Sequence, residues 1–223
     1  MFASLSRAQF EAACKAYIAA HSTQSVDAVC TFAIHPSGWT WNEHQYVPGL
    51  GYMSRFVPLS LNASEASSDK HEDYGLIPDD SEDEAAVSES REALTCTQSV
   101  VFSPTFQVPA FYFTIHRSNG APLSLKEIIA SPLLRPHTIP GSEATTFALS
   151  EQAASFPLLS QGDHPAHGTP AWYFHPCHTQ EAVGEIMTEV PLEGWAEDRV
   201  LCRWLEAWFM VVGQIADLQC GHA

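Results

Sequence analysis

The feature that most constrains the fold is a four-residue apolar run, residues 171–174, followed at once by His175-Pro176-Cys177. The run is typical of a buried strand, and Pro176 has no N–H to donate to a central ladder, so the strand must end there. A helix is expected next, because Thr179 is a plausible N-cap and apolar residues then recur at helical spacing over 183–187. The sequence therefore predicts a strand–loop–helix junction with a cysteine in the loop.

Cys177 is predicted to be a reactive thiol. It stands between His175 and His178, and a loop position gives it access to water and to a proton acceptor. Cysteine reacts as the thiolate, which neighbouring imidazoles and the positive end of a helix dipole both favour. Backbone N–H groups at a helix start also stabilise an oxyanion formed when an acyl group moves to or from sulfur. The pattern indicates a nucleophile, the alternative being an ordinary buried cysteine.

Length and charge narrow the class of protein. The 223 residues, 45% of them hydrophobic, fit one domain over residues 1–223. A net charge of -16 argues against nucleic-acid binding, which needs clustered Lys and Arg, so proteins are the expected partners. Six cysteines without a CxxC pair favour reduced thiols in the cytoplasm. The longest apolar stretch, residues 208–216, is well short of the roughly 20 residues that cross a bilayer.

Two amphipathic helices are predicted near the ends of the chain. In each, apolar residues recur every three or four positions and leave polar residues on the opposite face. The first helix has the apolar face Phe10, Cys14, Tyr17 and Ile18. The second is larger and more aromatic, with the face Leu201, Trp204, Leu205, Trp208, Val212 and Ile215. We expect both to pack on a sheet, and the second to be central to the core.

Strand-forming residues fill the chain between these helices. Residues 38–41 and 51–57 are rich in aromatic and β-branched side chains and flank a turn at Pro48-Gly49, which predicts an antiparallel pair. Residues 100–102 and 108–115 give two more strands, and a turn at 118–120 leads to a short helix over 123–129. The element order predicts an α/β fold of the α+β type, in which helices flank an antiparallel sheet.

An acidic segment interrupts this pattern. Residues 62–98 contain the run Asp79 to Glu84 and few large apolar side chains. Such a segment buries too little surface to offset its backbone entropy, so we expect a disordered insertion. Its simplest interpretation is a solvated loop; the alternative is a docking or phosphorylation segment with Ser81 and Ser88 in acidic surroundings.

Two other chemistries are open to the residues around the cysteine. A mixed zinc site is one, although its spacing is nonstandard; the five candidate ligands are His164, His167, His175, Cys177 and His178. A papain-like hydrolase is the other, since a cysteine and a histidine form its nucleophile and base. It would need a histidine downstream of the cysteine, where only His178 and His222 remain.

Two blocks of sequence resemble a known family. Residues 108–113 and 120–128 are similar to the central region of the autophagy-related protein 10 family, whose members are E2-like conjugating enzymes. The block His164-Pro165-x-x-Gly168-x-Pro170, a four-residue strand, and then His175-Pro176-Cys177-x-Thr179 resemble that family's active-site block at the same internal spacing. Weaker similarity extends to both predicted terminal helices. Two blocks in the same order are more specific than His-Pro-Cys alone.

The resemblance implies an E2-like fold, an antiparallel sheet flanked by N- and C-terminal helices. It implies that Cys177 accepts the ubiquitin-like autophagy-related protein 12 as a thioester from the E1-like autophagy-related protein 7. The modifier then passes to a lysine of autophagy-related protein 5. The implied chemistry needs no cofactor and no metal, because ATP is consumed earlier, by the activating enzyme.

The sequence departs from ubiquitin-type conjugating enzymes, which place His-Pro-Asn ahead of the cysteine. No asparagine occupies such a position here. Some members of the resembled family carry an asparagine two residues before the cysteine, where this chain has His175, and a strand tyrosine is implicated, for which Tyr112 is the nearest match. The alternatives are that His175 only caps the strand and that Tyr112 is a core residue. A noncatalytic adaptor with the same fold is the competing function.

Overall fold

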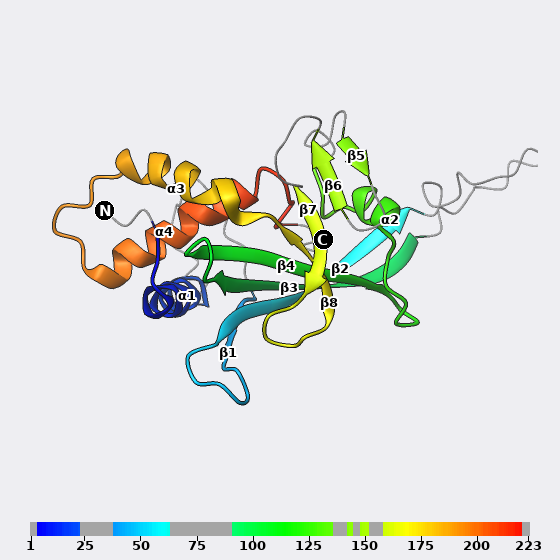
Figure 1. Cartoon of the computed structure of the whole chain (residues 1–223), viewed down its shortest axis with the longest axis horizontal. Coiled ribbons are helices and arrows are strands. Elements are labelled where there is room, and N and C mark those ends of the chain that lie inside the picture. Colours follow the sequence, from blue (N-terminus) through cyan, green and yellow to red (C-terminus); the bar gives the residue numbers. More distant parts are fainter. Residues whose placement is uncertain are drawn as a thin grey trace, which may run out of the picture.

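The structure is a computed structural model that describes residues 4–22, 38–62, 91–135, 142–144, 148–151 and 158–219. Figure 1 shows one sheet whose long strands run from α1, α3 and α4 at one end toward α2 at the other. The helices are α1 (Arg7–Ser22), α2 (Leu125–Ile129), α3 (Thr179–Thr188) and α4 (Glu197–Val212), with a 3-10 turn, η2, at Pro176–His178. The strands are β1 (Thr40–Asn42), β2 (Tyr52–Asn62), β3 (Arg91–Ser103), β4 (Val108–Arg117), β5 (Ser142–Ala144), β6 (Ala148–Glu151), β7 (Leu159–Asp163) and β8 (Pro170–Phe174).

The sheet is antiparallel throughout its described strands, in the order β1-β2-β3-β4-β8-β7-β6-β5. The predicted strand pair is confirmed, because Trp41 of β1 lies opposite Met53 of β2. The two strands predicted around residues 100 and 108–115 are also confirmed, and they form the β3–β4 hairpin. Helices and an antiparallel sheet in one chain confirm the predicted α+β, E2-like class.

The acidic insertion is shorter than predicted, because its expected end at residue 98 is wrong. Strand β3 begins at Arg91, and residues 91–98 pair with β2 in regular register. Leu94 and Cys96 are buried and alternate with the threonines at 95 and 97, which is the two-residue period of a half-buried strand. The acidic run itself lies outside the described residues, so its predicted disorder stays a prediction.

The core forms where α1 and α4 meet the sheet. The predicted face of α1 is confirmed, since Phe10, Cys14 and Tyr17 are buried. The predicted face of α4 is confirmed as well, and its buried residues are Leu201, Trp204, Leu205, Trp208 and Val212. Figure 1 shows α1 and α4 at the same end of the sheet, and the rings of Tyr17 and Phe209 join them at 4.9 Å. Ile215, predicted on the same face, lies beyond the end of the helix.

One cation is buried beneath these helices. Arg55 of β2 is 3% exposed, and its Nε donates to Gln98 Oε1 at 2.9 Å. A second guanidinium nitrogen donates to the carbonyl oxygen of Leu218 at 2.6 Å, and the group lies over the ring of Trp39 at 4.7 Å. A buried charge is tolerated only when its hydrogen bonds are made. Arg55 therefore joins the backbone at Leu218 to strands β2 and β3.

The helices are too short or too polar to enter a bilayer as spans. None of those in the described ranges combines the length and the apolar character that crossing a membrane requires.

Candidate active site

The strand–loop–helix junction predicted around Cys177 is present. Strand β8 ends at Phe174, η2 occupies Pro176–His178, and α3 follows directly. Pro176 stands at the first helical position, where its fixed φ suits a helix and its missing N–H costs nothing. Cys177 thus lies within the first turn of a continuous helical segment that begins where a central strand ends.

Thr179 does not act as the predicted N-cap, because α3 already includes it. Its hydroxyl donates to the carbonyl oxygen of Pro176 at 2.8 Å, and its backbone N–H bonds to the same oxygen. A capping side chain would accept a hydrogen bond from the helix start instead. The 3-10 turn takes over that role, so the positive end of the helix dipole lies at Cys177 itself.

Cys177 differs in its surroundings from the other cysteines that the structure describes. Cys14 and Cys96 are fully buried, and burial raises the pKa of Cys14. Cys202 is half-buried, and burial together with Glu206 raises its pKa to about 12. Cys177 is half-buried as well, but it stands in the first turn of a helical segment at the end of a strand. Among the four described thiols, Cys177 has the setting expected of a nucleophile.

His175 is held in place at the entrance to the helical turn. Its backbone N–H donates to the carbonyl oxygen of Leu158 at 3.1 Å, and its ring meets the ring of Phe106 edge-on at 5.3 Å. Phe106 belongs to the turn between β3 and β4. His175 is therefore packed between β8 and that turn, two residues before the sulfur. The side chain of His178, the other predicted neighbour, lies outside what the structure describes.

Tyr112 lies on β4, directly opposite Tyr173 of β8. Their rings stack at 5.1 Å, and Tyr112 also meets His164 edge-on at 5.3 Å. Burial, with a smaller contribution from Tyr173, raises the pKa of Tyr112. Cys177 follows Tyr173 by four residues, which sets its Cα at most roughly 13 Å from this rung of the ladder. Tyr112 is thus a half-buried side chain on the strand next to the cysteine's own strand.

A cluster of rings that sequence reasoning missed lies beside Tyr112. We call it the tyrosine–histidine cluster, and its members are Tyr52, Tyr112, His164, His167 and Tyr173. The two histidines stack at 4.5 Å, and the hydroxyl of Tyr52 is 2.9 Å from His167 Nε2. Both histidines belong to the loop between β7 and β8, which Figure 1 shows reaching back across the sheet. The cluster anchors this loop just ahead of the strand that leads to the cysteine.

The loop also encloses a small cavity of about 240 Å³ against the sheet. Val101, Ala110 and Tyr112 line it from the sheet, and Pro165 and Ala166 line it from the loop. The first part of the block that resembles a known family's active-site block, the loop between β7 and β8, therefore lies against strands β3 and β4.

Of the five zinc ligands considered over residues 164–178, the four whose side chains are described form no converging group of three. His167 Nε2 is engaged by Tyr52, and His164 Nδ1 accepts from the backbone N–H of Ala166 at 3.2 Å. Among the side chains that the structure describes, one group of three possible metal ligands converges, and it lies elsewhere: His21, Cys202 and Glu206.

The buried state of His164 predicts a pH-dependent stability. Burial, and secondarily His167, lower the pKa of His164 from about 6.5 to about 4. The unfolded chain gains a proton as the pH falls through about 6.5, whereas the folded chain gains it only near 4. The contribution of His164 to the free energy of unfolding is therefore complete above pH 6.5 and decreases below it, by about 1–2 kcal/mol at pH 5. Urea unfolding at pH 7.5 and 5 measures this change.

Variants show how much of the stability lost between pH 7.5 and 5 comes from His164 and how much from other titrating groups. His164→Gln is expected to reduce the loss between pH 7.5 and 5, whereas His44→Gln, in the β1–β2 connection, should leave the loss as it is in the unchanged protein. An equal loss in all three proteins would contradict the assignment.

Comparison with known proteins agrees with this geometry. The family model described as "Autophagocytosis associated protein, active-site domain" matches residues 9–222. The ubiquitin-like-conjugating enzyme ATG10 of Arabidopsis thaliana is 26% identical over 176 residues, which cover 76% of this chain and 72% of that protein. The ubiquitin-like-conjugating enzyme ATG10 of Homo sapiens is 27% identical over 127 residues, 57% of this chain and 50% of that protein. The chain therefore belongs to the family of autophagocytosis-associated active-site domains and is an E2-like conjugating enzyme of autophagy.

Proposed function

We propose that Cys177 accepts the ubiquitin-like autophagy-related protein 12 as a thioester from the E1-like autophagy-related protein 7, and that the chain transfers it to a lysine of autophagy-related protein 5 in the cytoplasm. The observation that carries the proposal is the position of Cys177 in the first turn of a helical segment, at the exit of a central strand. Family membership supplies the class of reaction.

The first step moves an acyl group between two sulfurs. The Cys177 thiolate attacks the carbonyl carbon of the thioester on the activating enzyme, a new C–S bond forms, and the activating enzyme's cysteine leaves as a thiolate. Negative charge collects on the carbonyl oxygen in between. Pro176 contributes no N–H, so the first backbone N–H groups of the helical segment are those of Cys177 and His178. These two groups are the ones we expect to stabilise the negative charge on that oxygen.

The second step moves the acyl group from sulfur to nitrogen. A neutral lysine amine of the acceptor attacks the thioester carbonyl, the C–S bond breaks, and Cys177 leaves as a thiolate while the amine loses a proton to a base. Holding the amine and thioester in contact supplies much of the rate. We assign His175 to the oxyanion or the acceptor amine, and Tyr112 to a supporting role from β4.

Substitution of these two residues should separate the steps. We expect His175→Ala to slow discharge onto the acceptor about 10- to 100-fold, because it removes a polar group near the reacting carbonyl. Tyr112→Phe keeps the ring that stacks on Tyr173 and loses only the hydroxyl, so we expect a smaller loss, about 10-fold. Thioester loading should stay close to normal in both. Single-turnover discharge of preloaded protein measures the rates.

Matched variants test whether these effects are specific. His44→Ala and Tyr46→Phe change the same residue types in the connection between β1 and β2, and Tyr46 is 78% exposed. Both should discharge at the normal rate. Normal discharge by His175→Ala and Tyr112→Phe would remove these residues from the mechanism.

Reconstitution tests the assignment of partners. The chain is mixed with autophagy-related proteins 7 and 12 and ATP, and the products are separated with and without a reducing agent. We expect one adduct that the reducing agent destroys and that omission of any component prevents. Adding autophagy-related protein 5 should convert it to a conjugate that resists reduction. Absence of the adduct, or its equal formation with ubiquitin, would refute the proposal and favour a noncatalytic adaptor or another modifier.

A further inference from the structure

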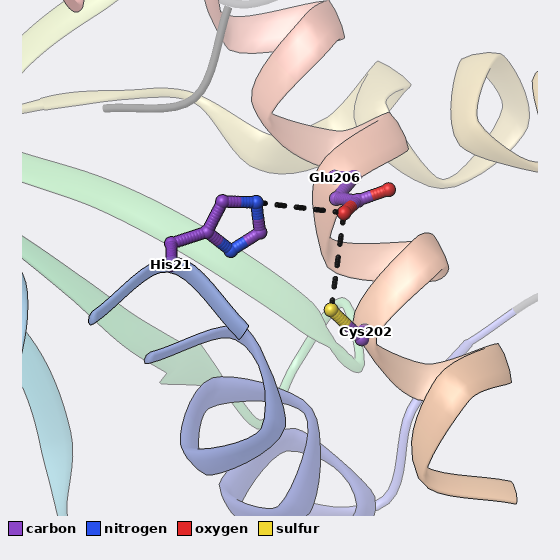
Figure 2. A group of neighbouring side chains, drawn as sticks. All are labelled: His21, Cys202 and Glu206. Carbon is purple, nitrogen blue, oxygen red and sulfur yellow. Dashed lines mark hydrogen bonds and ion pairs between the residues drawn. The ribbon is translucent and has the colours of Figure 1, made fainter. Parts of the chain in front are cut away.

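Three side chains that sequence reasoning did not connect meet between the C-terminal end of α1 and helix α4. His21 is in the last turn of α1, and Cys202 and Glu206 lie one turn apart on α4, a spacing that puts both on one helix face. Figure 2 shows Glu206 between the other two, with His21 Nε2 at 3.7 Å and Cys202 Sγ at 3.9 Å from its Oε1. The possible ligand atoms all lie within 4.8 Å of one another.

These distances are close to what a metal ion needs. Zinc binds nitrogen, sulfur and oxygen ligands at about 2.0–2.3 Å, so the ligand atoms of a tetrahedral site lie roughly 3.3–3.8 Å apart. Glu206 Oε1 is already 3.7 and 3.9 Å from the other two ligand atoms. His21 Nε2 and Cys202 Sγ, which lie within 4.8 Å of each other, reach that range by side-chain rotation. A simple hydrogen bond between the Cys202 thiol and the Glu206 carboxylate would not explain why His21 Nε2 approaches the same carboxylate oxygen.

The groups behind the three ligand atoms fix their orientation. His21 Nδ1 is 2.8 Å from the carbonyl oxygen of Tyr17, and the two rings stack at 4.2 Å, so Nε2 faces Glu206. The other carboxylate oxygen of Glu206 accepts from Arg203 at 3.0 Å. Metal-binding histidines usually donate their second ring N–H to a carbonyl or carboxylate. This cluster has that outer support already in place.

The cluster also opens onto solvent. A pocket of about 620 Å³ lies between the end of α1, the α3–α4 connection and α4, and Ala20, Cys202 and Glu206 are among its lining residues. An ion can therefore enter, and a water molecule can complete the fourth position that three protein ligands leave open.

We propose that His21 Nε2, Cys202 Sγ and Glu206 Oε1 bind one zinc ion, which joins the C-terminal end of α1 to α4. A histidine, a thiolate and a carboxylate suit zinc better than the oxygen-preferring Mg²⁺ or Ca²⁺. On binding, the Cys202 S–H proton is released to solvent and the thiolate takes the ion. The two negative ligands then neutralise the charge of the ion, and Arg203 keeps its contact with the outer oxygen of Glu206.

Zinc titration of the full, reduced, metal-stripped chain tests the proposal. Calorimetry with a competing chelator is expected to show one equivalent bound and a proton released. Cys202→Ala and His21→Ala should each weaken binding at least about 100-fold, and the near-isosteric Glu206→Gln about 10- to 100-fold. Thermal unfolding should shift upward with added zinc in the unchanged chain and show no such shift in Cys202→Ala.

Two controls and a spectroscopic readout keep the test decisive if a variant folds poorly. Cys177→Ser and His44→Ala should bind zinc as the unchanged chain does. Cobalt in place of zinc should give thiolate-to-metal absorption that disappears in Cys202→Ser and persists in Cys177→Ser. Zinc binding that survives Cys202→Ala and His21→Ala, that depends on Cys177, or that is weaker than about 100 μM would overturn the proposal. None of these outcomes depends on conjugating activity.

Discussion

Cys177→Ser is expected to stop transfer of the modifier to its acceptor, with a loss of at least about a thousandfold. A serine hydroxyl is a weaker nucleophile than a thiolate, and no strong base is assigned beside it. Any acyl group that serine does accept forms an oxygen ester, which an amine attacks more slowly than a thioester. We therefore expect a small amount of adduct that survives reducing agent. Gel analysis of loading and single-turnover discharge measures both properties.

Two further variants decide whether this loss belongs to the reacting sulfur. Cys177→Ala has no nucleophile and should form no adduct of either kind. Cys14→Ala removes a thiol buried in α1 and should load at the normal rate, at some cost in stability. A reducible adduct on Cys177→Ala would show that another residue carries the modifier.

Trp208→Ala is expected to remove about 4 kcal/mol of unfolding free energy. Trp208 is 0% exposed, and truncating a fully buried aromatic residue of this size costs about 3–5 kcal/mol through lost burial and the cavity left behind. Its Nε1 donates to the carbonyl oxygen of Pro109 at 3.1 Å, so truncation also strips a buried acceptor on β4 of its partner. Domains are stable by about 5–15 kcal/mol in all, so this one change threatens the fold. Urea unfolding gives the value.

Two milder substitutions separate the contribution of the hydrogen bond to Pro109 from that of the buried ring. Trp208→Phe keeps most of the volume and loses the bond to Pro109, so about 1–2 kcal/mol is expected. Met210→Ala, on the same helix but 41% exposed, should cost less than about 1 kcal/mol. A cost for Trp208→Ala no larger than that for Met210→Ala would mean that α4 is not packed on β4 as the structure has it.

The elements that could be predicted from sequence are those whose residues repeat with a clear period. Phe10, Cys14 and Tyr17 mark α1, and the aromatic face of α4 marks the largest helix. Cys177 could be found because a proline ends an apolar strand directly before it. These signals are local, and local signals survive into the folded structure when burial agrees with them.

The secondary-structure elements that differ from the prediction are those whose local pattern is weak and whose structure depends on contacts with distant strands. Residues 91–98 follow an acidic segment, and the alternation around Leu94 and Cys96 is too short to indicate a strand by itself. Pairing with β2 along their whole length makes them one. Strands β5 to β7 give no clear pattern in the sequence, because β5 and β6 are short and β7, Leu159–Asp163, carries one large apolar residue. Thr179 is not the N-cap, because a 3-10 turn precedes the helix and sequence pattern does not distinguish the two.

The side-chain clusters could not be predicted at all from local pattern. Tyr52 and His167 are 115 positions apart in sequence, and β2 reaches the β7–β8 loop only after the sheet has formed. His21 and Cys202 are brought together in the same way, by the packing of α1 on α4. The local sequence pattern of a segment carries no information on contacts with a distant segment. Co-varying positions in related sequences would be needed to predict them.

The sheet has a narrow seam on the path to Cys177. Ten residue pairs join β3 to β4, but two pairs join β4 to β8. Contacts between aromatic rings also join β8 to β4, and the ring centroid of Phe174 is 5.7 Å from those of both Phe111 and Phe113. Parts of a structure held by few contacts open locally at lower free energy than parts held by many. We therefore expect the sheet to open more readily between β4 and β8 than between β3 and β4, and Cys177 follows directly after β8.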